Sequence, residues 1–357
     1  MSKIKKILKN IPGIRLIVKP IKKLINSLNL SEANPSLPDS VRIEASALCQ
    51  LNCVSCPMRT DEKMRKDLQG RGNKRRGKGW LAFSDFKNFV DRHPFIKTIE
   101  LSNFGEMFLN PEIVSIIEYA FLKKVKLTAT NGVNLNTVSD EMLEALVKYE
   151  FDSMLVSIDG ASQEVYGAYR RNGDYDKVIG NIRKLNEYKQ KYDSIYPKLM
   201  WSYVLMEHNE QEVIKAKEEA KKLNMDISFK ITWDRDYIPK EREMLQKETG
   251  NTHLTRSEIE ESDPSVIYAY LYCHQLWSDP QINWDGRLLG CCCAEGDFGV
   301  NVFKKGLLKA LGARNLRYAK LMVQGKVKGR GRKARSTPCF GCARYKKMIE
   351  VNRYFAP

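Results

Sequence analysis

The stretch Ala-Leu-Cys-Gln-Leu-Asn-Cys-Val-Ser-Cys-Pro, residues 47–57, contains three cysteines in a C-x3-C-x2-C spacing. It follows residues 40–45, whose alternating pattern predicts a β-strand. Cys49, Cys53 and Cys56 therefore offer three soft thiolates to one small centre at the end of a strand. A cubane iron–sulfur cluster takes four ligands, so this run would leave one iron open to bind a small molecule and pass it an electron.

Two alternatives remain for these cysteines: a structural zinc site, which closes all four metal positions, or a chance grouping in a chain with nine cysteines. A disulfide framework does not fit, because the sequence shows no secretion signal and thiols stay reduced in the cytosol. We expect a cytoplasmic protein whose cysteines bind metal.

The cysteine run and its place after a first strand resemble the radical S-adenosylmethionine (SAM) superfamily. The resemblance implies that Cys49, Cys53 and Cys56 hold a 4Fe-4S cluster whose open iron binds SAM. In that family, an electron from the reduced cluster cleaves SAM to methionine and a 5'-deoxyadenosyl radical, which abstracts hydrogen from the substrate. It also implies a low-potential electron donor such as flavodoxin or ferredoxin.

Later segments resemble the family's second, third and fourth strands and the arginine segment that follows the fourth. Carried over position by position, the residues implied to bind SAM are Gly105, Glu106, Asn131, Ser157, Asp159, Arg170 and Arg171. The second-strand match is partial, because Phe104 stands where the family has a first glycine. The resemblance leaves open which arginine meets the SAM carboxylate. Each motif is weak alone, since Ser-Ile-Asp-Gly also suits an ordinary strand end and turn; their joint order carries the weight.

Apolar residues at helical spacing fill the intervals between these strands, as in Leu143, Leu146 and Val147 after Ser139. Alternating strands and helices predict right-handed crossovers and a parallel sheet. We therefore predict an α/β fold, a partial (β/α)6 TIM-like barrel of the radical SAM type over residues 38–240. Ligands of such barrels lie at the carboxyl ends of the strands, where the expected SAM residues fall.

A second cysteine group follows a polar stretch, residues 241–268, that we interpret as a connector. Residues 282–291 predict a hairpin with Asp-Gly as its turn. Residues 269–357 resemble the SPASM or shortened twitch extension of the family, which binds an auxiliary 4Fe-4S cluster. The resemblance makes its ligands Cys273, Cys291, Cys339 and Cys342. The further cysteines of a full SPASM pattern do not follow, so we expect one auxiliary cluster.

Four thiolates would close the coordination of this cluster, which suits an electron relay or a structural brace. Zinc is the alternative. Cys292 and Cys293 have no assigned ligand role. They are either small buried apolar residues or, as a catalytic alternative, hydrogen-atom donors.

The formal net charge of +17 is concentrated in three segments, residues 1–30, 61–80 and 326–335. The first lies in an amphipathic N-terminal segment, residues 1–37, without acids over its first thirty residues. This segment suits the inner surface of an anionic membrane, as a peripheral contact, or a helix packed across the barrel. The other two basic segments suit an anionic ligand or solvated loops.

These features predict a radical SAM oxidoreductase that oxidises an anionic, sugar-like small molecule, or a lipid-linked saccharide if the N-terminal segment binds membrane. Alternatives are a peptide-modifying SPASM maturase, an epimerase with a cysteine hydrogen donor, and an RNA-modifying or zinc-stapled nucleic-acid-binding protein. About 38 residues precede the predicted barrel, which counts against a leader-peptide-binding domain there. No RNA-binding module accompanies the positive charge, which counts against nucleic acid.

Overall fold

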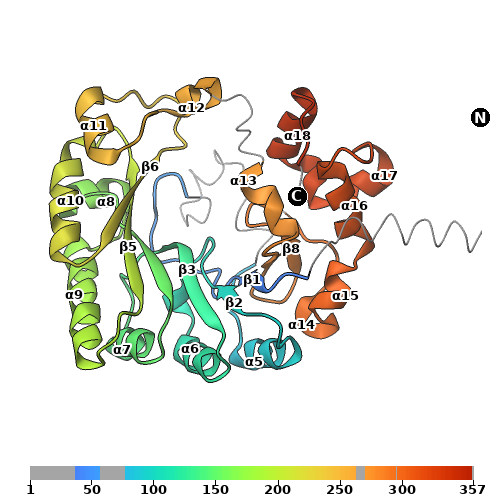
Figure 1. Cartoon of the computed structure of the whole chain (residues 1–357), viewed down its shortest axis with the longest axis horizontal. Coiled ribbons are helices and arrows are strands. Elements are labelled where there is room, and N and C mark those ends of the chain that lie inside the picture. Colours follow the sequence, from blue (N-terminus) through green and yellow to red (C-terminus); the bar gives the residue numbers. More distant parts are fainter. Residues whose placement is uncertain (1–36, 57–76, 263–269, 295, 356–357) are drawn as a thin grey trace, which may run out of the picture.

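The computed structural model describes residues 37–56, 77–262, 270–294 and 296–355 (Figure 1). The expected N-terminal basic segment up to residue 36, and residues 61–76 of the first basic loop, lie outside these ranges. No helix within them is long and apolar enough to cross a membrane.

Six parallel strands form a curved sheet in the order of the sequence, which confirms the predicted partial barrel. The strands are β1 (Ser40–Ile43), β2 (Thr98–Glu100), β3 (Lys126–Val133), β4 (Ser153–Ser157), β5 (Lys198–Leu205) and β6 (Asp226–Ile231). The helices of this part are α5 (Phe83–Arg92), α6 (Ile113–Leu122), α7 (Asp140–Lys148), α8 (Gln163–Tyr169), α9 (Tyr175–Lys191) and α10 (Val213–Lys222). The order of strands and helices follows from right-handed crossovers between neighbouring parallel strands.

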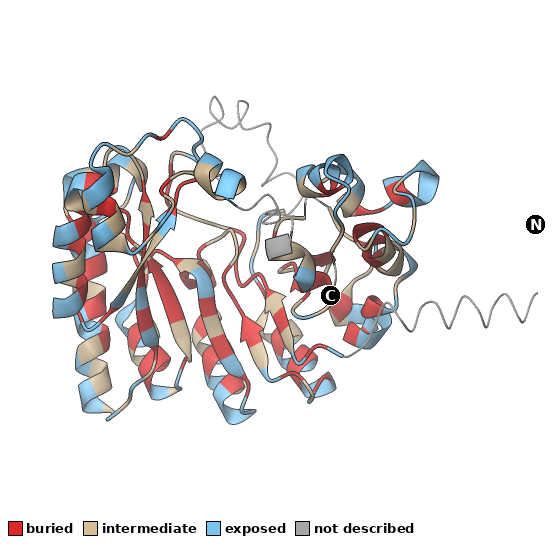
Figure 2. Ribbon diagram, turned by 45° about the horizontal axis from the view of Figure 1, so that its top comes forward, coloured by how far each residue is buried: buried red, intermediate tan, exposed pale blue. Residues whose placement is uncertain are grey.

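Local sequence explains where these helices begin. The hydroxyl of Ser139 accepts a hydrogen bond from the backbone N–H of Met142 at 3.2 Å, and acidic residues occupy the first turn of α7. Asp174 caps α9 in the same way, at 2.9 Å from the N–H of Lys177. The apolar faces of the helices then pack on the outer face of the sheet (Figure 2).

The inner face of the sheet is polar. Arg42, Glu100, Thr128 and Ser153 stand in register on β1 to β4 and therefore share one face. The neighbouring row of Val41, Ile99 and Leu127 is buried on the other face. Closed TIM barrels fill their interior with branched apolar side chains, so this interior is built differently.

The C-terminal part begins with the short helices α13 (Tyr270–Cys273) and η4 (His274–Leu276). The predicted hairpin follows as β7 (Gln281–Ile282) and β8 (Leu288–Gly290), which pair antiparallel. Gly286 has a φ of +85°, the conformation that the Asp-Gly turn requires. The rest of this part is helical: α14 (Val302–Lys305), α15 (Leu307–Leu311), α16 (Arg314–Val323), α17 (Gly331–Arg335), η5 (Pro338–Gly341) and α18 (Ala343–Glu350).

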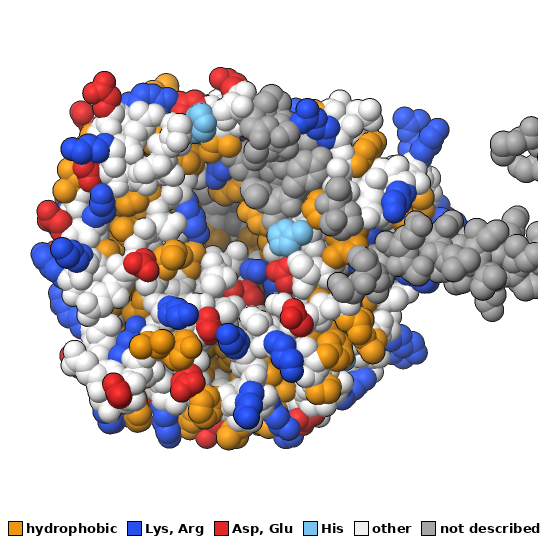
Figure 3. Space-filling view, in the orientation of Figure 1, with side chains coloured by type: hydrophobic (Ala, Val, Ile, Leu, Met, Phe, Trp, Pro, Cys, Tyr) orange, Lys and Arg blue, Asp and Glu red, His pale blue; other side chains and the backbone are white. Residues whose placement is uncertain are grey.

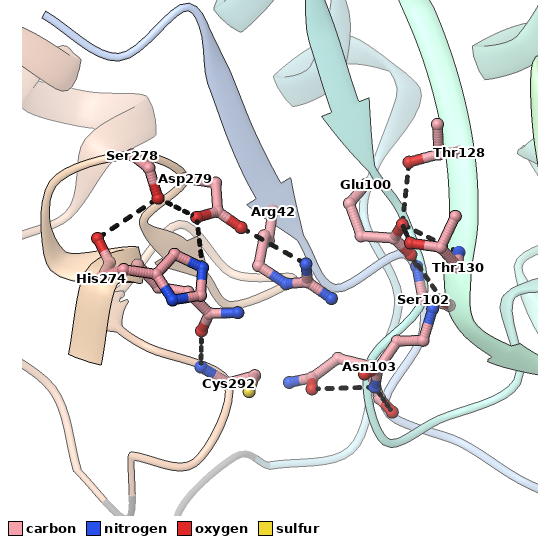
Figure 4. Close-up of polar contacts among 12 residues, drawn as sticks. Arg42, Glu100, Ser102, Asn103, Thr128, Thr130, His274, Ser278, Asp279 and Cys292 are labelled. Atoms are coloured by element: carbon pink, nitrogen blue, oxygen red, sulfur yellow. Dashed lines mark hydrogen bonds and ion pairs between the residues drawn. The ribbon is translucent and has the colours of Figure 1, made fainter. Parts of the chain in front are cut away.

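Strand β7 pairs in parallel with β1, so the hairpin extends the barrel sheet. The N–H of Glu44 donates to the carbonyl of Ile282 at 3.0 Å, and Arg42 forms an ion pair with Asp279 at 3.4 Å (Figure 4). The C-terminal part is thus attached to the strand that leads into the first cysteine run.

The connector is more structured than expected. It contains α11 (Arg242–Thr249) and α12 (Arg256–Ser262), which lie beyond β6 in Figure 1. Leu245 and Leu254 are fully buried and hold this stretch against the barrel. The connector has too few apolar residues to show a helical periodicity in its sequence, which is why its helices were not predicted.

Candidate active site

The first cysteine run follows β1 and is held by backbone hydrogen bonds to two distant segments. The N–H groups of Asn52 and Val54 donate to the carbonyls of Arg171 and Tyr169, at 2.9 and 3.2 Å. On its other side, the N–H of Glu106 donates to the carbonyl of Leu48 at 2.7 Å. The run therefore lies between the end of β2 and the segment that follows α8.

Gly105 allows this close approach. A Cβ at Gly105 would lie 1.9 Å from the backbone oxygen of Ser46, so no side chain fits there. The N–H groups of Gly105 and Phe104 both donate to one carboxylate oxygen of Glu44, at 2.9 and 3.1 Å. A single glycine at this turn is enough to bring the end of β2 against the cysteine run.

Glu106 is buried next to the cysteine run. Its carboxylate accepts hydrogen bonds from the N–H of Asn134 at 2.7 Å and of Phe108 at 3.4 Å. Burial raises its pKa to about 7 in spite of these hydrogen bonds. The side-chain nitrogen of Asn134 lies 3.9 Å from the Cys49 sulfur, and its side-chain oxygen accepts a hydrogen bond from the Gln50 side chain at 2.7 Å. The sequence prediction missed Asn134, which stands two residues beyond the Thr-Asn-Gly end of β3.

An ion pair faces the second cysteine. Asp159 is fully buried, and its carboxylate lies 2.6 Å from the Nε of Arg170 and accepts the N–H of Val204 at 2.9 Å. The same guanidinium lies 3.8 Å from the Cys53 sulfur. Burial raises the pKa of the Cys53 thiol, and the charge of Arg170 opposes that rise. The side chain of Arg171 is exposed, so of the two arginines Arg170 is the one whose side chain reaches the cysteine run.

Asn131 and Ser157 lie at the ends of neighbouring strands. The Asn131 side chain is exposed and donates to the carbonyl of Asn103 at 2.8 Å. Gly132, with a φ of +129°, has its backbone so close to β4 that a Cβ would lie 2.7 Å from the Ser157 hydroxyl oxygen. Both side chains thus stand at the carboxyl ends of strands, where the sequence placed them.

His208, beyond the end of β5, is a further candidate that the sequence did not mark. Its ring stacks on Tyr169 at 6.4 Å between centroids, and the charge of Asp159 acts on it. Among the residues with assigned positions, its buried Nε2 atom has no hydrogen-bond partner. Burial lowers the pKa of His208, which keeps the ring neutral at pH 7. A buried nitrogen without a protein partner is available to a ligand group or a water molecule.

The chemistry of the three thiols in the run suits an iron–sulfur cluster. In the described part of the chain, no three His, Cys, Asp or Glu side chains converge as the ligands of a single metal ion would. Burial, Glu106 and the neighbouring Cys53 and Cys56 nevertheless raise the pKa of Cys49 to about 12. The donor set fits an iron–sulfur cube that keeps these thiols deprotonated.

The second group is gathered in the C-terminal part. Burial raises the pKa of Cys291 and Cys339, and Cys273 and Cys342 raise both further. The four expected ligands thus lie close together. A cavity of about 350 Å³ is lined by Cys291, Cys339 and Cys342. Arg335 and Arg344 contribute to its wall, and with Cys293 four cysteines border this cavity.

The two remaining cysteines differ in their surroundings. Cys293 lines the same cavity, whereas Cys273 does not. Cys292 is buried, and its N–H donates to the Gln275 side chain at 2.8 Å. The two sulfurs lie 3.6 Å apart. Figure 4 shows Cys292 on the side of the C-terminal part that faces the barrel strands.

Comparison with known proteins agrees with this geometry. The model of the Radical SAM superfamily matches residues 43–220. The mycofactocin maturase MftC of Mycobacterium tuberculosis is 24% identical over 168 residues, which span 46% of this chain and 38% of the maturase. The chain therefore matches well under half the length of this relative.

Two crystal structures of Streptococcus suis SuiB share the fold. SuiB bound to S-adenosylmethionine aligns with a TM-score of 0.57 at 16% identity, covering 100% of this chain and 87% of SuiB. SuiB bound to the precursor peptide SuiA aligns with a TM-score of 0.56 at 15% identity, covering 79% of this chain and 66% of SuiB. The alignment extends through the C-terminal helices, as in SPASM-type structures. From its cysteine run, its partial barrel and the family match, the chain belongs to the radical SAM superfamily.

Proposed function

We propose that this radical SAM enzyme oxidises a polar, anionic, sugar-like small molecule by removing hydrogen from one of its C–H bonds. The observation that carries the proposal is the meeting of the cysteine run with the Arg170–Asp159 ion pair at the carboxyl ends of polar strands. A 4Fe-4S cluster with SAM would supply the 5'-deoxyadenosyl radical there. Cys49, Cys53 and Cys56 would hold that cluster.

The protein groups around the run would orient SAM. Arg170 is fixed by Asp159 and offers its positive charge to the SAM carboxylate. Glu106, the buried carboxylate next to Cys49, would receive the amino group of SAM. His208, as a neutral ring with a free Nε2 atom, suits a ribose hydroxyl, because each partner can donate or accept. Asn131 and Ser157 complete the strand ends that face the same ligand.

The polar interior supports a polar substrate. Glu100 accepts five hydrogen bonds, from the backbone and side chains of Ser102 and Thr130 and from the Thr128 hydroxyl. Burial opposes ionisation of Glu100, but these hydrogen bonds and the charge of Arg42 outweigh it and lower its pKa. An apolar substrate would remove water from the half-buried Arg42, Thr128 and Ser153 of the same row without replacing these contacts.

Cationic groups on the same interior support an anion. Arg42 lies beside Glu100 on one side of the barrel, and its buried Nε atom has no hydrogen-bond partner among the residues described. Lys230 lies on β6, where burial lowers its pKa and both Asp159 and Arg170 act on it. These groups would receive the charge of a phosphorylated or nucleotide-linked sugar.

Peptide modification is the second candidate. It is favoured by the similarity to MftC and SuiB, a maturase and a protein crystallised with a precursor peptide. The auxiliary cysteines would serve either reaction, since both need an electron acceptor near the substrate radical.

Anaerobic reconstitution tests the proposal. The wild-type protein should hold about eight irons and eight sulfides per chain and release 5'-deoxyadenosine only with reductant. Replacing Cys53 by Ala should abolish that release. Mass spectrometry after incubation with nucleotide-linked sugars, and separately with precursor peptides, then identifies the substrate. Zinc at one or two per chain without SAM cleavage would overturn the proposal.

A further inference from the structure

The last part of the chain is strongly basic, and Lys and Arg side chains lie on the side of the molecule that carries α16, α17 and α18 (Figure 3). Residues 301–357 contain sixteen lysines and arginines and one acid, Glu350, a net charge of +15. Nine of these cations are exposed between residues 326 and 353: Lys326, Lys328, Arg330, Arg332, Lys333, Arg335, Lys346, Lys347 and Arg353. We call this set the C-terminal basic surface. Charge this dense and of one sign attracts an acidic partner.

Packing brings the two ends of this surface together around the auxiliary cysteines. The segment before α17 packs against the segment that contains α18. Gly329 lies against Tyr345, and Gly325 lies against Tyr354. Helices α17 and α18 both contact η5, the turn that carries Cys339. Figure 1 shows α16, α17 and α18 grouped at the side of the molecule opposite α9 and α10. The cations therefore surround the segment that contains Cys339 and Cys342.

The same surface borders the thiol-lined cavity. Arg335 and Arg344 line this cavity together with Cys339 and Cys342. Two large apolar side chains are exposed within the basic surface, Phe340 at 38% and Ile349 at 47%. Apolar residues ringed by cations are typical of a transient protein interface steered by charge. A partner that docks here would come close to the cysteines.

We propose that the C-terminal basic surface docks an acidic one-electron carrier protein, a flavoprotein of the flavodoxin kind, next to the auxiliary cysteine site. The proposal rests on the proposed function, because a redox centre at these cysteines gives the partner its purpose. One electron would leave the reduced flavin, which becomes the semiquinone, enter the auxiliary cysteine site and pass on to the first site, where the cleavage of SAM would consume it. Nucleic acid or a lipid headgroup would gain nothing from a surface centred on thiols.

The test compares two fourfold charge reversals in the full-length reconstituted protein. The surface variant carries Lys328→Glu, Arg330→Glu, Arg332→Glu and Lys333→Glu. The control carries Lys124→Glu, Lys177→Glu, Lys221→Glu and Lys247→Glu, four exposed lysines on the barrel side of the molecule. Calorimetry measures binding of an acidic flavodoxin to each protein at low and at high salt. Iron content and melting temperature confirm that both variants fold.

We expect the surface variant to bind flavodoxin at least about tenfold more weakly than wild type at low salt, and the control to bind almost as wild type. Flavodoxin-driven release of 5'-deoxyadenosine should fall only in the surface variant, while release driven by dithionite stays equal in all three proteins. Equal binding by both variants would overturn the proposal. So would tight binding of RNA or anionic phosphatidylglycerol vesicles to this surface without binding of flavodoxin.

A failure of the proposed function and a failure of the docking surface give different results. If dithionite releases no 5'-deoxyadenosine from wild type, the proposed function fails, while the binding comparison still decides the docking surface. If dithionite works and the surface variant binds flavodoxin normally, only the docking surface fails.

Discussion

Arg170 connects the parts of the candidate site more directly than any other residue described. Its guanidinium is held by buried Asp159 at 2.6 Å and reaches Cys53 at 3.8 Å. A charge fixed in this way needs little reorganisation when an anionic ligand arrives. Arg171, the next residue, is exposed and contributes its backbone carbonyl to the cysteine run. The pair therefore provides a matched comparison.

Replacing Arg170 by Gln should weaken SAM binding about 10- to 100-fold, because a charge-assisted contact is lost and Asp159 is left buried without its partner. Arg171→Gln should leave SAM affinity within about twofold of wild type. Equilibrium dialysis with labelled SAM on the reconstituted proteins measures both. Equal losses in the two variants would refute the assignment of Arg170.

Gly105→Ala should displace the cysteine run, since its Cβ would meet the backbone of Ser46 at 1.9 Å. We expect a lower melting temperature and loss of about half or more of the iron of the first site. Gly180→Ala in α9, where no atom lies within 4 Å of the added Cβ, is the control and should slightly raise stability. If Gly105→Ala retained all of its iron, the close approach between Gly105 and the backbone of Ser46 would be contradicted.

At the scale of elements, periodicity and turn residues predicted most of the fold. The Ser139 cap, the apolar stripe of α7 and the Asp-Gly turn each specify local structure, and the structure has all three. The pairing of β7 with β1 was not predictable, because a strand of two residues has no pattern of its own. Motifs in the sequence predicted the strand-end residues of the candidate site. No motif marks Asn134 or His208, because only the tertiary fold brings Asn134 next to Cys49 and His208 next to Tyr169.

His93 joins α5 to α15 and should make stability depend on pH. Its Nε2 atom accepts the N–H of Leu307 at 2.8 Å, so Nδ1 carries the proton and donates to the Phe89 carbonyl at 2.7 Å. Burial lowers its pKa below the usual 6.5. The unfolded chain therefore binds a proton more readily, and this contribution is complete above pH 6.5 and lost as the pH falls.

The melting temperature of wild type should accordingly fall more between pH 7.5 and pH 5.5 than that of His93→Asn. Differential scanning calorimetry at both pH values measures the two slopes. His208 titrates equally in both proteins and cancels in the comparison. Identical slopes would show that His93 is not held neutral between the two helices.

At the scale of the whole molecule, the protein places two cysteine groups in two parts that share one sheet. The first group follows β1, and the second surrounds a cavity beyond β7 and β8, which continue that sheet. One strongly basic stretch, residues 326–335 with six lysines and arginines and no acid, lies next to the second group. This arrangement suits a SAM site on one side of the substrate and an electron path on the other.

Replacing Cys339 by Ala should separate these roles. The first site stays intact, so dithionite-driven release of 5'-deoxyadenosine should continue, while product formation falls by about tenfold or more. Liquid chromatography with mass spectrometry measures the two yields in one reaction. A parallel loss of both would mean that the second group supports the fold of the first.

The central claim is that Cys49, Cys53 and Cys56 hold a cluster with one iron open to SAM. Electron paramagnetic resonance tests it most directly on a protein with Cys339→Ala and Cys342→Ala, which leaves the first site alone. After anaerobic reduction, we predict the signal of one 4Fe-4S cluster, whose g values shift when SAM is added. A cluster signal that saturating SAM leaves unchanged would contradict the claim.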